Sequence, residues 1–92
     1  MTPKTDLTPP RLEFPCEYPI KVVARAGEKV RSHLDAIVDR HAGPLDLDMV
    51  VERPSAQSRF VSITYTITAR SPEHIAELFE ALKQHPQVIM VL

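Results

Sequence analysis

The apolar residues of this chain repeat with two different periods, and the order of those periods leaves few folds open. Three segments alternate between apolar and polar residues, which predicts strands over 19–25, 45–52 and 59–70. Two segments repeat every three to four residues, which predicts helices over 27–43 and 71–85. An apolar run at 87–92 predicts a short last strand. The predicted order is therefore strand, helix, strand, strand, helix, strand.

Local signals mark the ends of both predicted helices. Glu28 falls in the first turn of the first helix, where a negative charge suits the helix dipole, and Gly43 marks its end. Ser71 is the expected cap of the second helix, with Pro72 at its first position. Pro86 ends that helix, so the last strand must follow within a few residues.

This order predicts a ferredoxin-like (ACT-like) α+β sandwich, in which a four-stranded antiparallel βαββαβ sheet carries two helices on one face. The spatial order of the strands is then fourth, first, third, second, and the second and fourth strands form the edges. Ninety-two residues suffice for one domain, which we expect over 14–92. The proline-rich residues 1–13 are expected to be a flexible leader.

The alternation also predicts which side chains face the helices. The first and third strands are expected to bury Ile20, Val22, Ala24, Val61, Ile63, Tyr65, Ile67 and Ala69. In the second strand the residues expected to face inward are Leu45, Leu47, Met49 and Val51. Those expected on its outer face, as charges that discourage stray pairing, are Asp46, Asp48 and Glu52.

The last strand is different, because Val88 to Leu92 carries no charge and forms an edge. Its open side holds either Ile89 and Val91 or the set Val88, Met90 and Leu92. An uncovered apolar edge is an aggregation hazard, so we expect another segment or another chain to cover this strand, and there are two candidates. One is the segment "RLEFPCEY", which brings Leu12, Phe14 and Tyr18 back over the sheet. The other is a second subunit or a partner protein.

The open face of the sheet supports the second cover, because it combines Val23 with a column of threonines that is smooth and weakly polar. The residues that we expect to face a partner or ligand are Lys21, Val23, Arg25, Thr64, Thr66, Thr68 and Val91.

Three stretches, "EFPCEYPIKVV", "RPS" before "VSITYTITA", and the terminal "QVIMVL", resemble the YbeD-like family of small uncharacterised bacterial proteins. The resemblance covers roughly residues 12–92. That family is similar to the ACT regulatory domain, a ferredoxin-like module that commonly binds amino acids at dimer interfaces. The resemblance therefore implies a regulatory role and a small metabolite, such as an amino acid, at a subunit interface. This chain has Ala24 where relatives usually carry a glycine, with Gly27 further on, which argues against a ligand in that loop.

Composition excludes several classes of function. A net charge of −1 and a pI near 6.4 argue against bulk attraction to nucleic acid or an anionic membrane. No stretch approaches the roughly 20 apolar residues of a membrane span, and the beginning of the chain does not look like a signal peptide. A single cysteine is typical of cytosolic proteins. We therefore expect a cytoplasmic protein.

Catalytic and metal-binding chemistry finds little support. Cys16 stands beside Glu17, a poor setting for a nucleophile, and we interpret it as structural. Surface positions are predicted for His33, His41, His74 and His85, whose spacing does not suit zinc. The chain has only two glycines, Gly27 and Gly43, and they cannot form a phosphate-binding loop. We therefore expect no cofactor, and the histidine spacing predicts no metal.

The sequence thus predicts a non-enzymatic regulatory or adaptor module that acts through its open sheet face and last strand. We expect a homo-oligomer or a complex with a protein partner. Two alternatives of other classes are an RNA-binding module that uses the open sheet and a cysteine-dependent enzyme. Base stacking needs several aromatic side chains, and the open positions of the third strand offer only Phe60.

Overall fold

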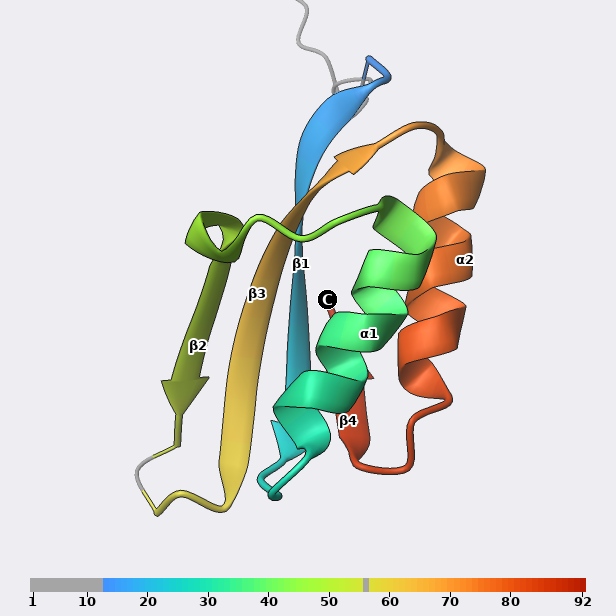
Figure 1. Cartoon of the computed structure of the whole chain (residues 1–92). Coiled ribbons are helices and arrows are strands. Elements are labelled where there is room, and N and C mark those ends of the chain that lie inside the picture. Colours follow the sequence, from blue (N-terminus) through green and yellow to red (C-terminus); the bar gives the residue numbers. More distant parts are fainter. Residues whose placement is uncertain (1–12, 56) are drawn as a thin grey trace, which may run out of the picture.

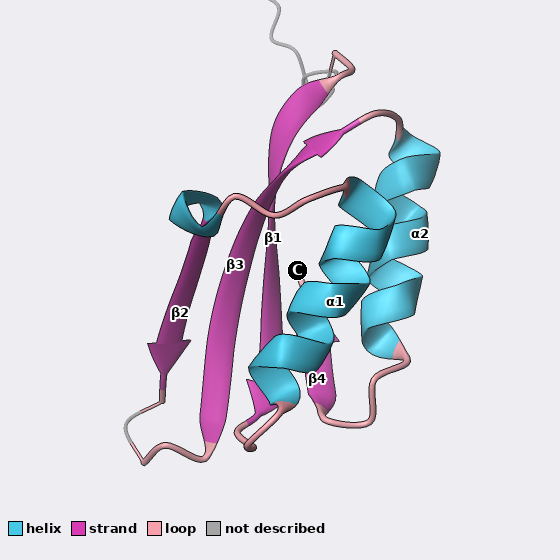
Figure 2. Ribbon diagram, in the orientation of Figure 1, coloured by secondary structure: helices cyan, strands magenta, loops and turns pink. Residues whose placement is uncertain are grey.

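The computed structural model describes residues 13–55 and 57–92 of the chain and confirms the predicted architecture. Its elements are β1 (Cys16–Arg25), α1 (Val30–Ala42), a 3₁₀ turn η1 (Leu47–Met49), β2 (Val50–Pro54), β3 (Phe60–Ala69), α2 (Pro72–Lys83) and β4 (Val88–Val91). The strands form one antiparallel sheet in the order β2-β3-β1-β4. Both helices lie on the same face of the sheet (Figure 1). The opposite face has no helix over it in the described part of the chain (Figure 2).

The central pair, β1 and β3, is registered over ten residues, from Cys16 opposite Ala69 to Arg25 opposite Phe60. β1 begins earlier than predicted, so Pro19 lies inside the strand and does not begin it. The N–H of Lys21 donates to the Leu92 carbonyl, on the β4 side of β1. The nitrogen of Pro19, two residues earlier, faces the same side, beyond the β4 pairing at Val22–Ala24. Its missing N–H therefore interrupts no ladder bond.

The core lies between the sheet and the helices, as the alternation predicted. Tyr65, Ile63 and Ile20 are fully buried on the sheet side. Leu34 of α1 and Leu78 of α2 are fully buried on the helix side. All eight inward positions predicted for the first and third strands are buried: Ile20, Val22, Ala24, Val61, Ile63, Tyr65, Ile67 and Ala69.

The helix ends follow the local signals at the end of α1 and at the beginning of α2. Gly43 adopts φ 85°, a conformation that favours glycine, where α1 ends. Ser71 Oγ accepts the His74 N–H at 3.0 Å and caps α2, with Pro72 in its first turn. The exception is the beginning of α1, which starts at Val30 without an acidic residue in its first turn. Glu28 lies before the helix, so its predicted role was wrong.

The prediction for His74 was also wrong, because this side chain is buried and does not lie on the surface. Its Nδ1 accepts the Arg70 N–H at 3.0 Å, so Nε2 carries the proton of the neutral ring. That Nε2 donates to the His41 carbonyl at 2.7 Å. The imidazole therefore joins the beginning of α2 to the last turn of α1.

The facing of β2 differs from the prediction by one residue. Residues 47–49 form the 3₁₀ turn η1, and Asp46 Oδ1 caps it by accepting the Asp48 N–H at 3.0 Å. Because the strand begins only at Val50, opposite the inward-facing Tyr65, Val50 and Glu52 lie on the helix side. Val51 faces the open side and Leu47 is exposed. Asp46 and Asp48 thus belong to a turn and do not decorate the edge of a strand.

A β-bulge sets the facing of β4. Val22 is opposite Val91 and Val23 is opposite Met90, but Ala24 is opposite Val88, which leaves Ile89 as the extra residue. Val88 and Val91 both pack against the core under the helices. The predicted place of Val91 on the open face was therefore wrong, and neither of the two predicted alternations describes the strand.

The segment expected to fold back over the sheet packs on the core side instead. Phe14, before β1, and Tyr18, within β1, both pack against the core, so they do not cover the open face. The predicted leader, residues 1–13, and Leu12 within it lie outside the described residues apart from Glu13. No helix in the described part of the chain is long and apolar enough to cross a membrane.

Candidate functional site on the open sheet face

The open face is built from cross-strand rows of side chains. Thr64 of β3 is opposite Lys21 of β1 and Val51 of β2. Lys21 and Leu92 exchange both backbone hydrogen bonds, at 3.0 and 2.8 Å, so the Leu92 side chain extends this row beyond β4. The next row joins Arg53, Ser62, Val23 and Met90, and the last pairs Phe60 with Arg25.

Six of the seven residues predicted to face a partner or ligand lie on this face: Lys21, Val23, Arg25, Thr64, Thr66 and Thr68. Thr66 and Thr68 are opposite Pro19 and Glu17, at the end of the face that β2 does not reach. The seventh residue, Val91, belongs to the core side. The structure thus brings the threonine column and the two cations of β1 together, and whether a partner contacts them stays a prediction.

Exposed apolar side chains flank this column, and none of them was among the seven predicted site residues. Val51 on β2 is 50% exposed and Phe60 at the start of β3 is 40% exposed. On the opposite edge the exposed residues are Ile89, Met90 and Leu92. The strict alternation of β3 placed Phe60 outward, whereas the facing of Val51 depended on the 3₁₀ turn before it.

β4 leaves one edge of the sheet open within the described residues, since β1 is its one neighbour there. Its four residues, Val88–Val91, carry no charge, proline or glycine. Natural sheets usually blunt such an edge with charged side chains or proline. The bulge at Ile89 is another feature that interrupts such an edge, and within the described residues no strand pairs with the outer side of β4.

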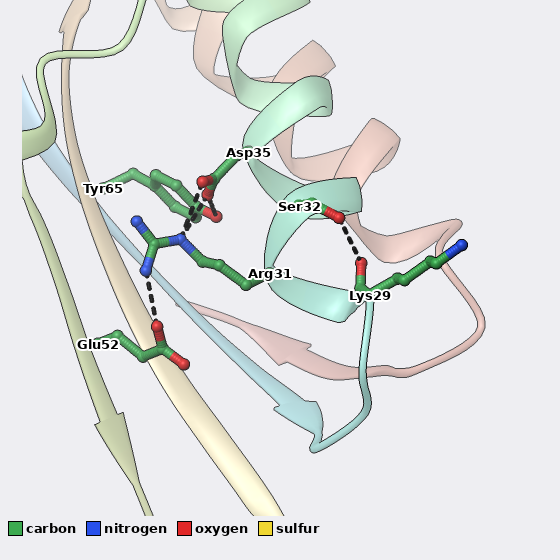
Figure 3. Close-up of polar contacts among 6 residues, drawn as sticks. All are labelled: Lys29, Arg31, Ser32, Asp35, Glu52 and Tyr65. Atoms are coloured by element: carbon green, nitrogen blue, oxygen red, sulfur yellow. Dashed lines mark hydrogen bonds and ion pairs between the residues drawn. The ribbon is translucent and has the colours of Figure 1, made fainter.

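A polar network fastens the other edge strand to α1 (Figure 3). Arg31 of α1 donates from Nε to both carboxylate oxygens of Asp35, at 2.7 and 2.9 Å. Its Nη1 donates to Glu52 Oε1 on β2 at 2.6 Å. Tyr65 of β3 completes the network, because its hydroxyl donates to Asp35 Oδ1 at 2.6 Å.

The chemistry of this network is structural. Burial raises the pKa of the Tyr65 phenol, and its hydrogen bond to the Asp35 carboxylate raises that pKa further. The hydroxyl therefore stays protonated and serves as a donor, not as a base. Because α1, β2 and β3 each contribute, the network holds β2 and hence the row through Val51 in place.

His33 and His85, which are far apart in the sequence, lie next to each other in the structure. His85 accepts the Gln87 N–H on Nδ1 at 3.1 Å, so its neutral ring carries the proton on Nε2. That nitrogen lies 3.5 Å from His33 Nδ1. The pair connects α1 to the loop before β4. Within the described residues no group of three or more histidine, cysteine or acidic side chains is placed to hold a metal.

Two hollows bear on small-molecule binding. The larger, about 840 Å³, lies between α1 and α2 and is lined mainly by exposed side chains, including Arg40, Glu77 and Glu80. The smaller, about 200 Å³, lies beside the end of β3 and is lined by residues that include Glu17, Gly43, Asp46, Thr66 and Thr68. Two predicted site residues thus line the smaller hollow.

Gly27 has a packing role. A Cβ atom on this residue would lie 3.0 Å from Val30 Cγ2, at the first residue of α1. The glycine therefore allows the loop after β1 to close against the helix.

Comparisons with known proteins agree with this architecture. The solution structure of protein HP0495 from H. pylori matches with a TM-score of 0.74 and 18% identity, over 99% of this chain and 96% of that one. A UPF0250 protein from Pseudomonas aeruginosa is 41% identical over the whole of both chains. Another, from Hahella chejuensis, is 40% identical over 90% of this chain and 91% of its own. The model of a family described as "Protein of unknown function (DUF493)" matches residues 9–92. With matches of this length and identity, the chain belongs to the DUF493 (UPF0250) family of small bacterial proteins, the YbeD-like group.

Proposed function

We propose that this chain is a non-enzymatic regulatory or adaptor module that acts by contact, through its open sheet face and its last strand. One observation carries the proposal. Of the large apolar side chains exposed in the described residues, all but Leu47 belong to the strands or to the residue after β4: Val51, Phe60, Ile89, Met90 and Leu92. They flank the column formed by Ser62, Thr64 and Thr66 on β3. Three of them, Ile89, Met90 and Leu92, lie in β4 or directly after it, at the edge of the sheet.

The β4 edge is the part best suited to pairing with another chain. An exposed strand without charge or proline offers backbone N–H and C=O groups to a second strand, and flanking apolar side chains add specificity. A second copy of this chain is one source of such a strand, which would extend the sheet across the interface. A partner protein is the other.

Charges placed on this edge should abolish pairing with a second copy. We expect wild-type protein to dimerise with increasing concentration in sedimentation equilibrium, and the double variant Ile89→Lys, Met90→Lys to stay monomeric. Both side chains are nearly half exposed, at 47% and 46%, so the fold should tolerate the change. Leu47→Lys is the control and should dimerise normally, because Leu47 is 69% exposed and lies in η1 before β2, at the opposite edge of the sheet from β4. Wild-type protein that is monomeric at millimolar concentration would exclude self-pairing through β4.

A small metabolite such as an amino acid, bound on the open face away from the β4 edge, is the finer part of the proposal. The hollow lined by Thr66 and Thr68, at about 200 Å³, supports it. Pockets for drug-sized ligands usually exceed about 300 Å³, so only a small molecule would fit.

A ligand in this hollow should raise the melting temperature. At 100 times its dissociation constant a ligand stabilises by about 2.7 kcal/mol. For a domain of this size that is on the order of 10 °C. We expect one of the twenty amino acids to produce such a shift in a thermal-denaturation screen, and Thr66→Val, Thr68→Val to reduce it. Absence of a shift across the screen, or an equal shift in the variant, would remove the metabolite from this hollow.

A further inference from the structure

One end of the open face carries an exposed aromatic ring, Phe60, with three arginines in the strands and the turn beside it. Arg25 lies directly opposite Phe60, and Arg53 is opposite Ser62, one diagonal step away. Arg59 immediately precedes Phe60 in the sequence. We call Arg25, Arg53 and Arg59 the arginine cluster.

Two shallow hollows adjoin the Phe60 ring. One, of about 430 Å³, is lined by Arg25, Ala26, Ser58, Arg59, Phe60 and Gln87. The other, of about 260 Å³, is lined by Ser55, Gln57, Arg59 and Phe60. Neither lining contains an aspartate or a glutamate. Phe60 therefore lines both hollows, and the charged residues that line them with it are the arginines Arg25 and Arg59.

The charge of the arginine cluster is not neutralised within residues 13–55 and 57–92. The salt bridges found there lie on the helix side of the sheet and join Arg31 to Asp35, Arg31 to Glu52 and Lys83 to Glu80. On the open face of the strands the acidic side chain is Glu17, opposite Thr68 at the far end. Glu17 and Arg25 are eight positions apart along β1, or about 26 Å at about 3.3 Å per residue. Although the whole chain has a net charge of −1, this end of the sheet is locally basic.

We propose that the arginine cluster and Phe60 bind an acidic segment of a partner protein, whose carboxylates meet the arginines while an apolar side chain covers the ring. This inference rests on the proposed function and names the partner for one part of the open face. Arginine and aromatic side chains dominate the binding energy of protein interfaces, and unpaired arginines favour carboxylates because the guanidinium can bind them with two parallel hydrogen bonds.

Charge disfavours a two-fold contact of a second copy centred on this patch. In such a contact each arginine cluster would face the other. Like charges facing one another across an interface cost several kcal/mol. Self-pairing through β4 remains compatible with this assignment, because the edge strand carries no charge.

The neighbouring side chains favour protein over nucleic acid. A single-stranded nucleic acid is held by successive aromatic rings on which its bases stack. Here the positions that follow Phe60 along β3 on the open face are Ser62, Thr64 and Thr66. Apolar Val51 and Met90 lie at the two edges, where they suit apolar side chains of a protein segment.

Peptides of defined charge test this inference. The probes are a ten-residue peptide that alternates glutamate and valine, its lysine–valine counterpart and a ten-residue oligothymidylate, each titrated into labelled full-length protein and followed by amide chemical shifts. We expect the acidic peptide to shift amides of residues 23–25, 53 and 59–62, with an affinity that falls at least tenfold between 50 and 300 mM salt. The variant Arg25→Glu, Arg53→Glu should weaken binding at least tenfold. The control Arg40→Glu, Lys83→Glu makes the same change in net charge on the helices and should bind as wild type.

Three other outcomes would overturn the proposal in different ways. Equal binding of the lysine peptide at the same residues would overturn the preference for an acidic partner but leave the open face as a contact surface. Tighter binding of oligothymidylate would make the patch a nucleic-acid site. If neither peptide shifts any residue of the open face, both this inference and the contact role of that face fail.

Discussion

Replacing Val91 with aspartate is expected to lower the free energy of unfolding by about 3 kcal/mol, whereas the same change at the adjacent Met90 should cost under about 1 kcal/mol. The reason is the bulge at Ile89, which turns Val91 toward the core under the helices and Met90 toward the open face. Aspartate at position 91 loses the apolar contacts of valine and brings a carboxylate into an apolar environment. At position 90 it meets solvent, since Met90 is 46% exposed.

Urea denaturation of the two variants and wild type would measure this difference, with unchanged slopes showing that all three unfold between comparable states. For a domain of this size about 3 kcal/mol is roughly a fifth or more of the total stability, and it lowers the melting temperature by more than about 10 °C. Equal costs at the two positions, or a larger cost at Met90, would contradict the facing of β4.

The parts of the fold that the sequence could predict are those with redundant signals. β3 alternates over ten residues, so its facing is determined several times over, and each predicted inward side chain from Val61 to Ala69 is buried. The C-terminal end of α1 and the beginning of α2 are marked by Gly43, Ser71 and Pro72, whose backbone or capping preferences are specific.

The edge strands could not be predicted as well, and the reason is local geometry. A shift of one residue moves every side chain of a strand to its other face. The residues Leu45 to Glu52 alternate as a strand would, yet the first half forms a 3₁₀ turn that Asp46 caps. In β4 all residues are apolar, so no alternation reveals the bulge that places both Val88 and Val91 inward.

The errors in the two edge strands, β2 and β4, limited how much of the candidate site could be predicted from the sequence. The threonine column and Arg25 were predicted because β1 and β3 were predicted correctly. Arg53 was missed because the predicted second strand ended at Glu52, whereas β2 continues to Pro54 and pairs Arg53 with Ser62 on the open face. The contacts of Arg31 with Glu52 and of His33 with His85 join residues 21 and 52 positions apart, which no local pattern reveals.

The network that holds β2 leads to the second large stability effect. Asp35→Ala is expected to lower the free energy of unfolding by about 2 kcal/mol, because it leaves the fully buried Tyr65 without an acceptor for its hydroxyl. The ion pair itself contributes less, since the Arg31 and Asp35 side chains are 34% and 26% exposed. Tyr65→Phe removes the need for an acceptor and should cost only about 1 kcal/mol.

The double variant separates these contributions. Once the hydroxyl is gone, loss of Asp35 no longer leaves a buried donor unpaired, so Asp35→Ala, Tyr65→Phe should cost less than the sum of the single variants by about 1 kcal/mol. Glu52→Ala is the control, because its contact with Arg31 is 41% exposed on the Glu52 side and should contribute under about 1 kcal/mol. Chemical denaturation of the four variants and wild type measures each term. Strictly additive costs would mean that Tyr65 and Asp35 stabilise the domain independently of each other.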